Sequence, residues 1–192
     1  MQLVFATHNN NKVREIKPLF PPSVSISTLT EIGINEEIPE TAETIEGNAI
    51  LKARFVYNTL KLNCFADDTG LEVSALNGAP GVYSARYAGE GKTASDNIAK
   101  LLYELKGKSN RSAKFKTVIA AIINGKEYLF EGLVNGNITL TAAGANGFGY
   151  DPVFMPEGLT TTFAEIPLEQ KNRLSHRALA VNKFIEFLKA KI

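Results

Sequence analysis

Disulfides and cysteine-based metal sites are the first features that this sequence lacks. Cys64 is the only cysteine among 192 residues, and its apolar neighbours predict a small buried hydrophobe. No apolar run approaches the roughly 20 residues that cross a membrane. The amino terminus lacks the basic flank and the length of a signal peptide. A lone cysteine suits a reducing compartment, so we expect a cytoplasmic protein without a membrane partner.

An excess of one charge is also missing. The sequence has 21 Lys and Arg against 20 Asp and Glu, which gives a formal net charge of +1. Proteins that bind nucleic acid polymers rely on a clustered excess of basic residues, so this composition argues against such a partner. Any site for an anion must therefore be local. The length suits one domain, residues 1–192, that buries a substantial core and has room for two lobes.

Two adjacent carboxylates stand at the centre of the chain. The apolar run Leu62–Ala66 leads directly into Asp67, Asp68, Thr69 and Gly70. This pattern predicts a buried strand that delivers polar groups at its carboxyl end, where α/β proteins place their sites. Successive side chains of a strand point to opposite faces, so we expect only one of the two carboxylates to act.

The apolar segment that follows decides how this acidic pair is interpreted. Leu71–Val73 predicts another short strand, so Asp67 and Asp68 lie between two apolar segments. On these residues alone, a strand followed by an ordinary Asp-Gly turn remains the alternative. Carboxylates in apolar surroundings require a partner, and a hard cation with oxygen ligands, Mg²⁺ or Mn²⁺, fits them.

The amino-terminal segment combines a strand, a polar turn and a helix. Leu3–Ala6 predicts the strand, and the helix carries Val13 and Ile16 on one side. We expect the three asparagines of the turn to aim backbone N–H groups, together with Lys12, at an anion. An asparagine-capped helix with a solvated lysine is the alternative.

The remaining pattern predicts an α/β fold with a mixed sheet. Asn124-Gly125 is a strong hairpin signal, and antiparallel strands are therefore combined with parallel strand–helix units. The expected helices are 44–60, 93–106 and 174–188, and Thr44 and Ser175 are the expected caps of the first and the last. The expected strands include 24–29, 114–123 and 127–134.

Two further stretches combine polar and aromatic residues. In the glycine-rich stretch 143–152, Phe148 and Tyr150 offer flat faces for a base, although a structural turn is the alternative. His176 and Arg177 follow the expected cap of the last helix. The helix dipole disfavours cations there, so the pair indicates a compensating ligand unless both side chains point into water.

Four motifs together resemble the inosine triphosphate pyrophosphatase family, also called the Ham1 or RdgB family. The resemblance lies in the amino-terminal residues Thr7, Asn9, Lys12 and Glu15, in 66–71 with 78–87, in 147–154, and in Lys171-x-x-x-Ser175-His176-Arg177. It implies a single ITPase-like (Maf/Ham1) α/β domain. That domain is a mixed elongated sheet flanked by helices, in two lobes with the active site in the cleft between them.

The resemblance also implies an activity. Members of this family hydrolyse non-canonical purine nucleoside triphosphates (ITP, dITP and XTP) to the monophosphate and pyrophosphate, which cleanses the nucleotide pool. They use Mg²⁺ and are typically homodimers. A non-catalytic nucleotide sensor and a Maf-like pyrophosphatase acting on other nucleotides remain the alternatives.

Roles for individual residues follow from the same resemblance. Asp68 is expected to be the general base, because a carboxylate near the metal can accept a proton from water, and Glu40 and Asp68 are the expected metal ligands. Glu40 lies in an acidic stretch, 31–43, that otherwise predicts a solvated loop, with Glu43 as a weaker candidate. His8 stands where many relatives have a small residue. The implied substrate contacts are Thr7, His8, Asn9, Asn10, Asn11, Lys12, Thr69, Phe148, Gly149, Tyr150, Asp151, Lys171, His176 and Arg177.

Overall fold

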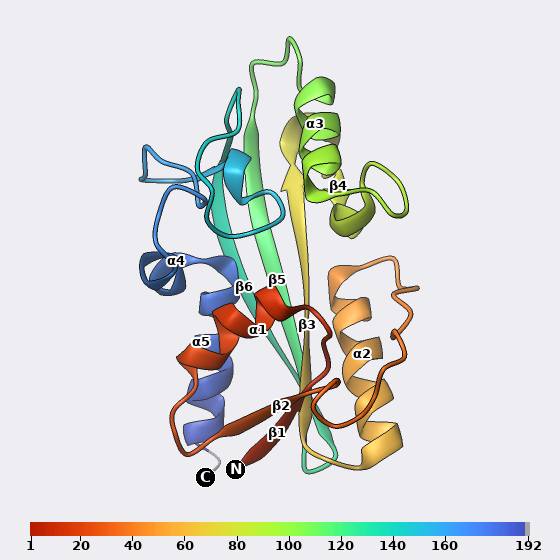
Figure 1. Ribbon diagram of the computed structural model, residues 1–192. Helices are drawn as coiled ribbons and strands as arrows, with labels where there is room; N and C mark the ends of the chain where they lie inside the picture. Colours follow the sequence, from red (N-terminus) through yellow and green to blue (C-terminus); the bar gives the residue numbers. More distant parts are fainter. Residues whose placement is uncertain (191–192) are drawn as a thin grey trace. The chain divides into compact units, whose positions relative to one another are not determined.

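The computed structural model describes residues 1–190, which form two compact units (Figure 1). Unit 1 contains Met1–Asp68, Thr117–Gly132 and the carboxyl-terminal residues 177–190. Unit 2 contains Thr69–Lys116 and Leu133–His176. The two units agree with the expectation of two lobes, while the cleft between them stays a prediction. No helix within residues 1–190 combines the length and the apolar character that crossing a membrane requires.

A mixed seven-stranded sheet supplies the framework, as the sequence predicts. Its order is β2-β1-β3-β5-β6-β7, with β4 paired to β3. β1 is parallel to β2 and β3, whereas β4 and β7 are antiparallel to their neighbours β3 and β6. The strands are β1 (Gln2–Phe5), β2 (Ser25–Thr28), β3 (Cys64–Val73), β4 (Pro80–Gly81), β5 (Ser112–Ile123), β6 (Lys126–Ile138) and β7 (Phe154–Pro156).

In unit 1, helices cover both faces of the sheet, because alternate strand residues point to opposite sides. Leu3, Phe5 and Phe65 pack with α1 and α5, whereas Val4 and Cys64 pack with α2. The rings of Phe5 and Phe65 stack with centroids 4.5 Å apart. The helices are α1 (Asn10–Ile16), α2 (Ile45–Leu60) and α5 (His176–Lys189), and a 3₁₀ turn, Lys17–Leu19, follows α1.

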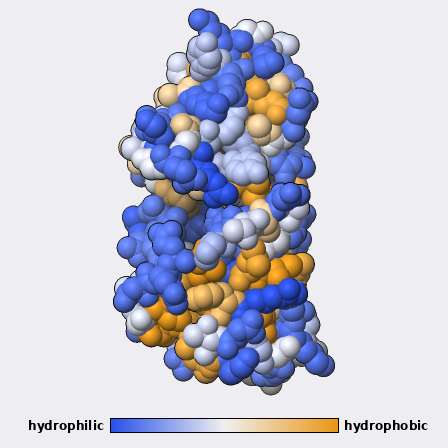
Figure 2. Space-filling view, turned by 90° about the vertical axis from the view of Figure 1, so that its right-hand side faces the viewer, coloured by the Kyte–Doolittle hydropathy of each residue, from blue (hydrophilic) through white to orange (hydrophobic). Residues whose placement is uncertain are grey.

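Figure 2 shows the face of the molecule that carries α2, where apolar side chains remain partly exposed. Ile38, Ile50 and Phe55 are partly buried against the α2 side of the core, and Leu51 is 37% exposed. The segment before α2 therefore packs on this helix through its isoleucines, although it forms neither a helix nor a strand between residues 34 and 44.

Unit 2 has a core of its own, built from one face of β3, β5 and β6 with α3 (Ala94–Glu104) and α4 (Leu168–Leu174). Thr93 and Asp96 form a reciprocal capping box at the start of α3, and Gly107, with a φ of 74°, follows its end. Helix α4 and the short strands β4 and β7 are absent from the sequence-based expectations.

One expected break in the chain is wrong. Asp67 and Asp68 do not follow the end of a strand, since β3 runs without interruption from Cys64 to Val73. The reason is pairing along the whole segment: Cys64 and Phe65 pair with β1, and Leu71 and Glu72 pair with β4. The Asp-Gly turn is therefore excluded, because neighbouring strands hold the chain extended on both sides of the acidic pair.

Two local predictions are confirmed. Asn124 and Gly125 join β5 to β6 with φ values of 51° and 77°, the left-handed conformations of a tight hairpin turn. Cys64 is fully buried, and its burial raises the pKa of the thiol to about 12. The cysteine is therefore a core residue of unit 1.

Candidate active site

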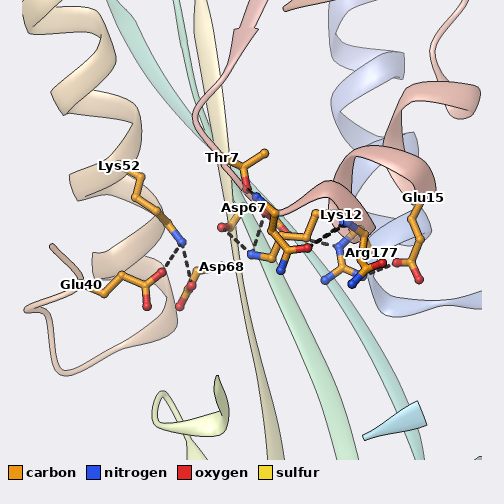
Figure 3. A network of polar contacts seen from close by, with 10 residues as sticks. Thr7, Lys12, Glu15, Glu40, Lys52, Asp67, Asp68 and Arg177 are labelled. Carbon is orange, nitrogen blue, oxygen red and sulfur yellow. Dashed lines mark hydrogen bonds and ion pairs between the residues drawn. The ribbon is translucent and has the colours of Figure 1, made fainter. Parts of the chain in front are cut away.

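A cluster of buried and half-buried charges in unit 1 gathers residues from four helices and strands and from the segment before α2 (Figure 3). We call it the charged cluster. It contains three cations and four carboxylates: Lys12, Lys52, Arg177, Glu15, Glu40, Asp67 and Asp68. The chain brings them together because β3 presents its two carboxylates to opposite faces of the sheet, where α1 and α5 lie on one side and α2 on the other.

Asp67 is the counter-ion for two cations. Its carboxylate lies 2.9 Å from Lys12 Nζ and 3.1 Å from Arg177 Nε, and only 1% of the residue is exposed. Burial alone would raise the pKa of Asp67. The positive charges of Lys12, Arg177 and Lys52 outweigh that penalty and lower the pKa to about 2. Asp67 therefore stays ionised and holds two cations in place.

Arg177 also pairs with Glu15 of α1. Burial opposes its charge, but the two carboxylates outweigh burial and raise the pKa of the guanidinium. The sequence predicted a ligand that compensates the charge of Arg177 at the start of α5. In the structure, the carboxylates of Glu15 and Asp67 compensate it. The alternative, in which Arg177 points into water, is wrong. Whether Arg177 also recognises a base stays a prediction.

Asp68 faces the other side, toward α2. Lys52 Nζ lies 2.8 Å from Asp68 Oδ1 and 2.9 Å from Glu40 Oε1, so one ammonium bridges the two expected metal ligands. Burial raises the pKa of Asp68, and the neighbouring charge of Glu40 acts in the same direction, while Lys52 and Lys12 oppose the rise. Asp68 thus binds a proton more readily than an exposed aspartate, as a general base must.

Glu40 and Asp68 offer a donor set that fits Mg²⁺. Both provide hard carboxylate oxygens within hydrogen-bonding distance of the same ammonium group. Within residues 1–190, no group of three or more His, Cys, Asp or Glu side chains could hold a metal. Mg²⁺ commonly uses one or two carboxylates and completes its shell with water and substrate phosphates, so two carboxylates suffice.

The amino-terminal turn differs from the expected anion-binding loop. Asn9 caps α1, and its Oδ1 accepts hydrogen bonds from the N–H groups of Asn11 and Lys12 at 3.0 and 3.2 Å. Thr7 Oγ1 accepts the N–H of Asn9 at 3.1 Å. The N–H groups of Asn9, Asn11 and Lys12 are therefore already used inside the turn, contrary to the expectation that they are aimed at an anion. The capped-helix alternative describes the backbone, but Lys12 is paired with Asp67 and is not solvated.

Other expected contacts in this region are placed as follows. Asn10 and Asn11 are exposed, and Thr69 is a half-buried residue of β3. His8 is half-buried, with Nε2 3.1 Å from the Glu36 carbonyl oxygen and Nδ1 3.3 Å from Thr30 Oγ1. His8 therefore connects the amino-terminal turn to the acidic segment before α2.

In unit 2, a second buried ion pair organises the glycine-rich stretch. Lys171 Nζ lies 2.5 Å from Asp151 Oδ2, and each residue is 2% exposed. The same oxygen accepts the N–H of Phe148 at 2.8 Å, and Lys171 Nζ lies 5.3 Å from the centre of the Phe148 ring. A Cβ on Gly147, whose φ is 73°, would lie 2.0 Å from Asp151 Oδ2, so only glycine fits there. Gly149 also has a left-handed φ, of 62°.

Two rings of unit 2 are packed more deeply than the sequence suggests. Tyr150 is 4% exposed and donates its hydroxyl hydrogen to the Ser84 carbonyl at 2.9 Å, so its ring is a core residue and the expected stacking face is wrong. His176 is 2% exposed and stacks on Phe115, with ring centroids 4.5 Å apart. Neither residue points into water, and of the two aromatic rings expected to hold a base only Phe148 remains half-exposed.

Lys52 is the main residue that sequence reasoning did not select. It lies four residues after Asn48 on α2, so the two side chains were expected on one face of the helix. The spacing alone did not show whether that face belongs to a functional site or is an ordinary solvent-facing polar face. Its position between Glu40 and Asp68 depends on contacts 12 and 16 residues away. Asp67 and Asp68 pair with different cations on opposite faces of the sheet, as the alternation of strand side chains predicts.

The fold and the charged cluster define an α/β protein in which adjacent carboxylates of one strand are each held by buried cations. The model of the Ham1 family matches residues 3–187, and the chain belongs to this family. It is 57% identical over 190 residues to a dITP/XTP pyrophosphatase of Flavobacterium johnsoniae, with 99% of each chain covered. It is 53% identical to the dITP/XTP pyrophosphatase of Porphyromonas gingivalis, with 97% of each covered.

Solved structures agree with this assignment. The Ham1 protein of Staphylococcus aureus matches with a TM-score of 0.91 and 40% identity over the full length of both chains. A nucleoside-triphosphatase, also named dITP/XTP pyrophosphatase, from Mycobacterium abscessus matches with a TM-score of 0.78 and 39% identity, covering 96% of this chain and 99% of that one.

Proposed function

We propose that this chain is a Mg²⁺-dependent nucleoside triphosphate pyrophosphatase that converts dITP, XTP and ITP to the monophosphate and pyrophosphate. The observation that carries the proposal is the charged cluster, in which Asp68 has a raised pKa and shares Lys52 with Glu40. Relatives that match almost the whole chain are named dITP/XTP pyrophosphatases, which supports the substrate class.

Asp68 is the proposed general base. The reaction needs a water molecule to attack the α-phosphorus, and a carboxylate with a raised pKa accepts its proton better than an ordinary aspartate does. The proton moves to Asp68 while pyrophosphate leaves. Mg²⁺ held by Glu40 and Asp68 would neutralise phosphate charge and acidify the attacking water. Asp67, with a pKa of about 2, is a poor base and keeps Lys12 and Arg177 in position.

Lys12 and Lys52 are the proposed phosphate ligands of unit 1. Lys52 is buried and Lys12 half-buried, and each pairs with a carboxylate, so its charge is held in place before substrate binds. Phosphoryl transfer needs little from the protein beyond positioning and neutralisation of charge, which two fixed ammonium groups provide. The resemblance assigns the nucleoside to the glycine-rich stretch together with Lys171 and His176.

Product analysis tests the proposal. ITP is incubated with Mg²⁺ and the purified protein, with Asp68→Asn beside it. IMP and pyrophosphate from the unaltered chain, and their loss in the variant, are the expected result. IDP and phosphate would contradict cleavage at the α-phosphorus, and ITP that survives prolonged incubation would favour a nucleotide sensor. A panel of triphosphates separates this activity from a Maf-like preference for other nucleotides.

The homodimer implied by the resemblance and the cytoplasmic setting expected from the composition belong to this proposal as well. Size-exclusion chromatography with light scattering tests the first, since a mass close to twice the 20.9 kDa of the chain is expected. Replacement of Mg²⁺ by Mn²⁺ tests the metal, because hard oxygen ligands accept both ions.

A further inference from the structure

The segment that carries Glu40 has no secondary structure of its own, yet Glu40 must meet Asp68 for the two to share a metal. Residues 34–44 form neither helix nor strand and lie between β2 and α2. Glu40 is partly exposed, in contrast to buried Lys52 and Asp68. Its position therefore depends on whatever holds this segment in place.

At its amino-terminal end the segment is held by His8. The Glu36 carbonyl oxygen can only accept a hydrogen bond, so Nε2 of His8, 3.1 Å away, carries the proton. In the neutral ring, Nδ1 then accepts from the Thr30 hydroxyl at 3.3 Å. His8 follows Thr7 in the turn between β1 and α1, so it links that turn to the segment.

At its carboxyl-terminal end the segment is held by α2. Asn48 Oδ1 accepts the N–H of Ala42 at 2.9 Å, and Asn48 is fully buried. The first turn of α2 also packs directly on Ala42, because a Cβ on Gly47 would lie 2.6 Å from the Ala42 Cβ. Glu40 thus lies between two attached points, Glu36 and Ala42.

The amide of Asn48 is poorly suited to a purely structural task. Its Nδ2 is buried without a hydrogen-bond partner within residues 1–190. A buried donor without an acceptor lowers stability, so an apolar side chain would serve packing better. The residue also lies one helical turn before Lys52 on the same face of α2. What the amide provides is the bond to Ala42 beside the charged cluster.

We propose that His8 and Asn48 are positioning residues that attach the segment before α2 at Glu36 and at Ala42 and thereby present Glu40, which lies between these two points, to the metal. The inference rests on the proposed function, since it assigns Glu40 to the Mg²⁺ site. Neither residue contacts the reacting atoms. Each acts through Glu40, in the way that outer-shell partners orient metal ligands elsewhere.

The test uses four variants of the full chain and two measurements. His8→Ala and Asn48→Ala remove the attachments, and His8→Gln keeps a side-chain N–H that can reach Glu36. Asn97→Ala is the matched control, because buried Asn97 holds the N–H of Ala88 at 2.7 Å by the same amide-to-backbone bond in unit 2. Hydrogen exchange is measured over residues 36–43, and Mn²⁺ affinity is measured by electron paramagnetic resonance with the non-hydrolysable analogue α,β-imido-ITP.

Both alanine variants are expected to speed exchange over 36–43 and to weaken Mn²⁺ binding about tenfold, the scale typical of lost outer-shell partners. His8→Gln should recover most of the affinity. Asn97→Ala should speed exchange near Ala88 and leave Mn²⁺ binding unchanged. Equal Mn²⁺ affinity in Asn48→Ala and the unaltered chain would overturn the inference, even if the variant melts at a lower temperature. An unaltered chain that binds no Mn²⁺ with the analogue overturns the proposed function itself.

Discussion

Two neighbouring aspartates of one strand show how strongly the surroundings of a residue decide its chemistry. Asp67 and Asp68 are both buried, yet the pKa of Asp67 is lowered and that of Asp68 is raised. Asp67 has two cations in direct contact, whereas the single cation of Asp68 is shared with Glu40. One carboxylate is therefore a counter-ion and the other a candidate base.

We predict that amide substitution costs much more stability at Asp67 than at Asp68. Asp67→Asn leaves the buried Arg177 and the half-buried Lys12 short of a counter-ion and should lower the free energy of unfolding by about 3–5 kcal/mol. Asp68→Asn replaces a carboxylate whose ionised form is already disfavoured, so it should cost far less stability while abolishing hydrolysis. Urea unfolding, followed by circular dichroism, measures the first effect. A smaller loss in Asp67→Asn than in Asp68→Asn would contradict the assignment.

The pKa of Asp67 also predicts a pH dependence of stability. Because the folded pKa of about 2 lies below the ordinary value of 3.8, ionised Asp67 stabilises the fold above about pH 4. That contribution, about 2–3 kcal/mol, is lost as the pH falls from 4 toward 2. The measurement is best made in Asp68→Asn, because the raised pKa of Asp68 makes stability depend on pH with the opposite sign. Adding Asp67→Asn should flatten the profile in this window.

At the scale of single elements, α2 and α5 each contain a residue in the first turn that local helix preferences disfavour. Gly47 lies in the first turn of α2, although glycine is a poor helix former. Arg177 lies in the first turn of α5, where the dipole disfavours cations. In both cases a contact outside the helix outweighs the local preference.

Gly47→Ala should therefore destabilise the protein despite the better propensity of alanine. The new methyl group would meet the Ala42 Cβ at 2.6 Å, and Ala42 has no flexible side chain that could give way. We expect a loss of about 1–3 kcal/mol, typical of overpacking, and a rise in the Mg²⁺ concentration needed for half-maximal hydrolysis. Thermal melting and a Mg²⁺ titration measure the two effects. A gain in stability would show that the segment moves freely.

Arg177 connects α5 to α1 and β3, and its substitution tests two roles at once. Arg177→Lys keeps one charge but lacks the planar fork that serves both Glu15 and Asp67, so we expect a loss of stability of about 1–3 kcal/mol. If Arg177 also recognises the base, Arg177→Ala relaxes or destroys the preference for ITP over ATP. The ratio of kcat/KM values for the two nucleotides measures it, and an unchanged ratio in a folded variant excludes that role.

At the scale of the whole molecule, Cys64 reports on unfolding. It is the only cysteine, lies in the core of unit 1 and has a thiol pKa raised to about 12. A buried thiol with few thiolate ions reacts slowly, so labelling should require unfolding of this unit. We expect the labelling rate with an aromatic disulfide to rise with urea in parallel with unfolding, and to rise in Asp67→Asn. Fast labelling of the native chain would contradict the buried position.

The sequence by itself determined the family and the longer helices and strands other than the full length of β3. Hydrophobic periodicity, the Thr44 cap and the Asn124-Gly125 hairpin act over a few residues, so they predict α2 and the β5–β6 hairpin without knowledge of the fold. The continuous course of β3 could not be predicted in this way. It depends on pairing partners that lie more than 50 residues earlier and about ten residues later in the chain.

Only the tertiary structure decided which charges meet. Arg177 pairs with Asp67 and Glu15 across separations of 110 and 162 residues, and no local spacing encodes such a contact. The same holds for Lys52, whose partners depend on the path of the segment that carries Glu40. Long-range ion pairs form where packed helices and strands bring side chains together. A single sequence therefore indicates which residues can act, while the fold decides which charged side chains pair with one another.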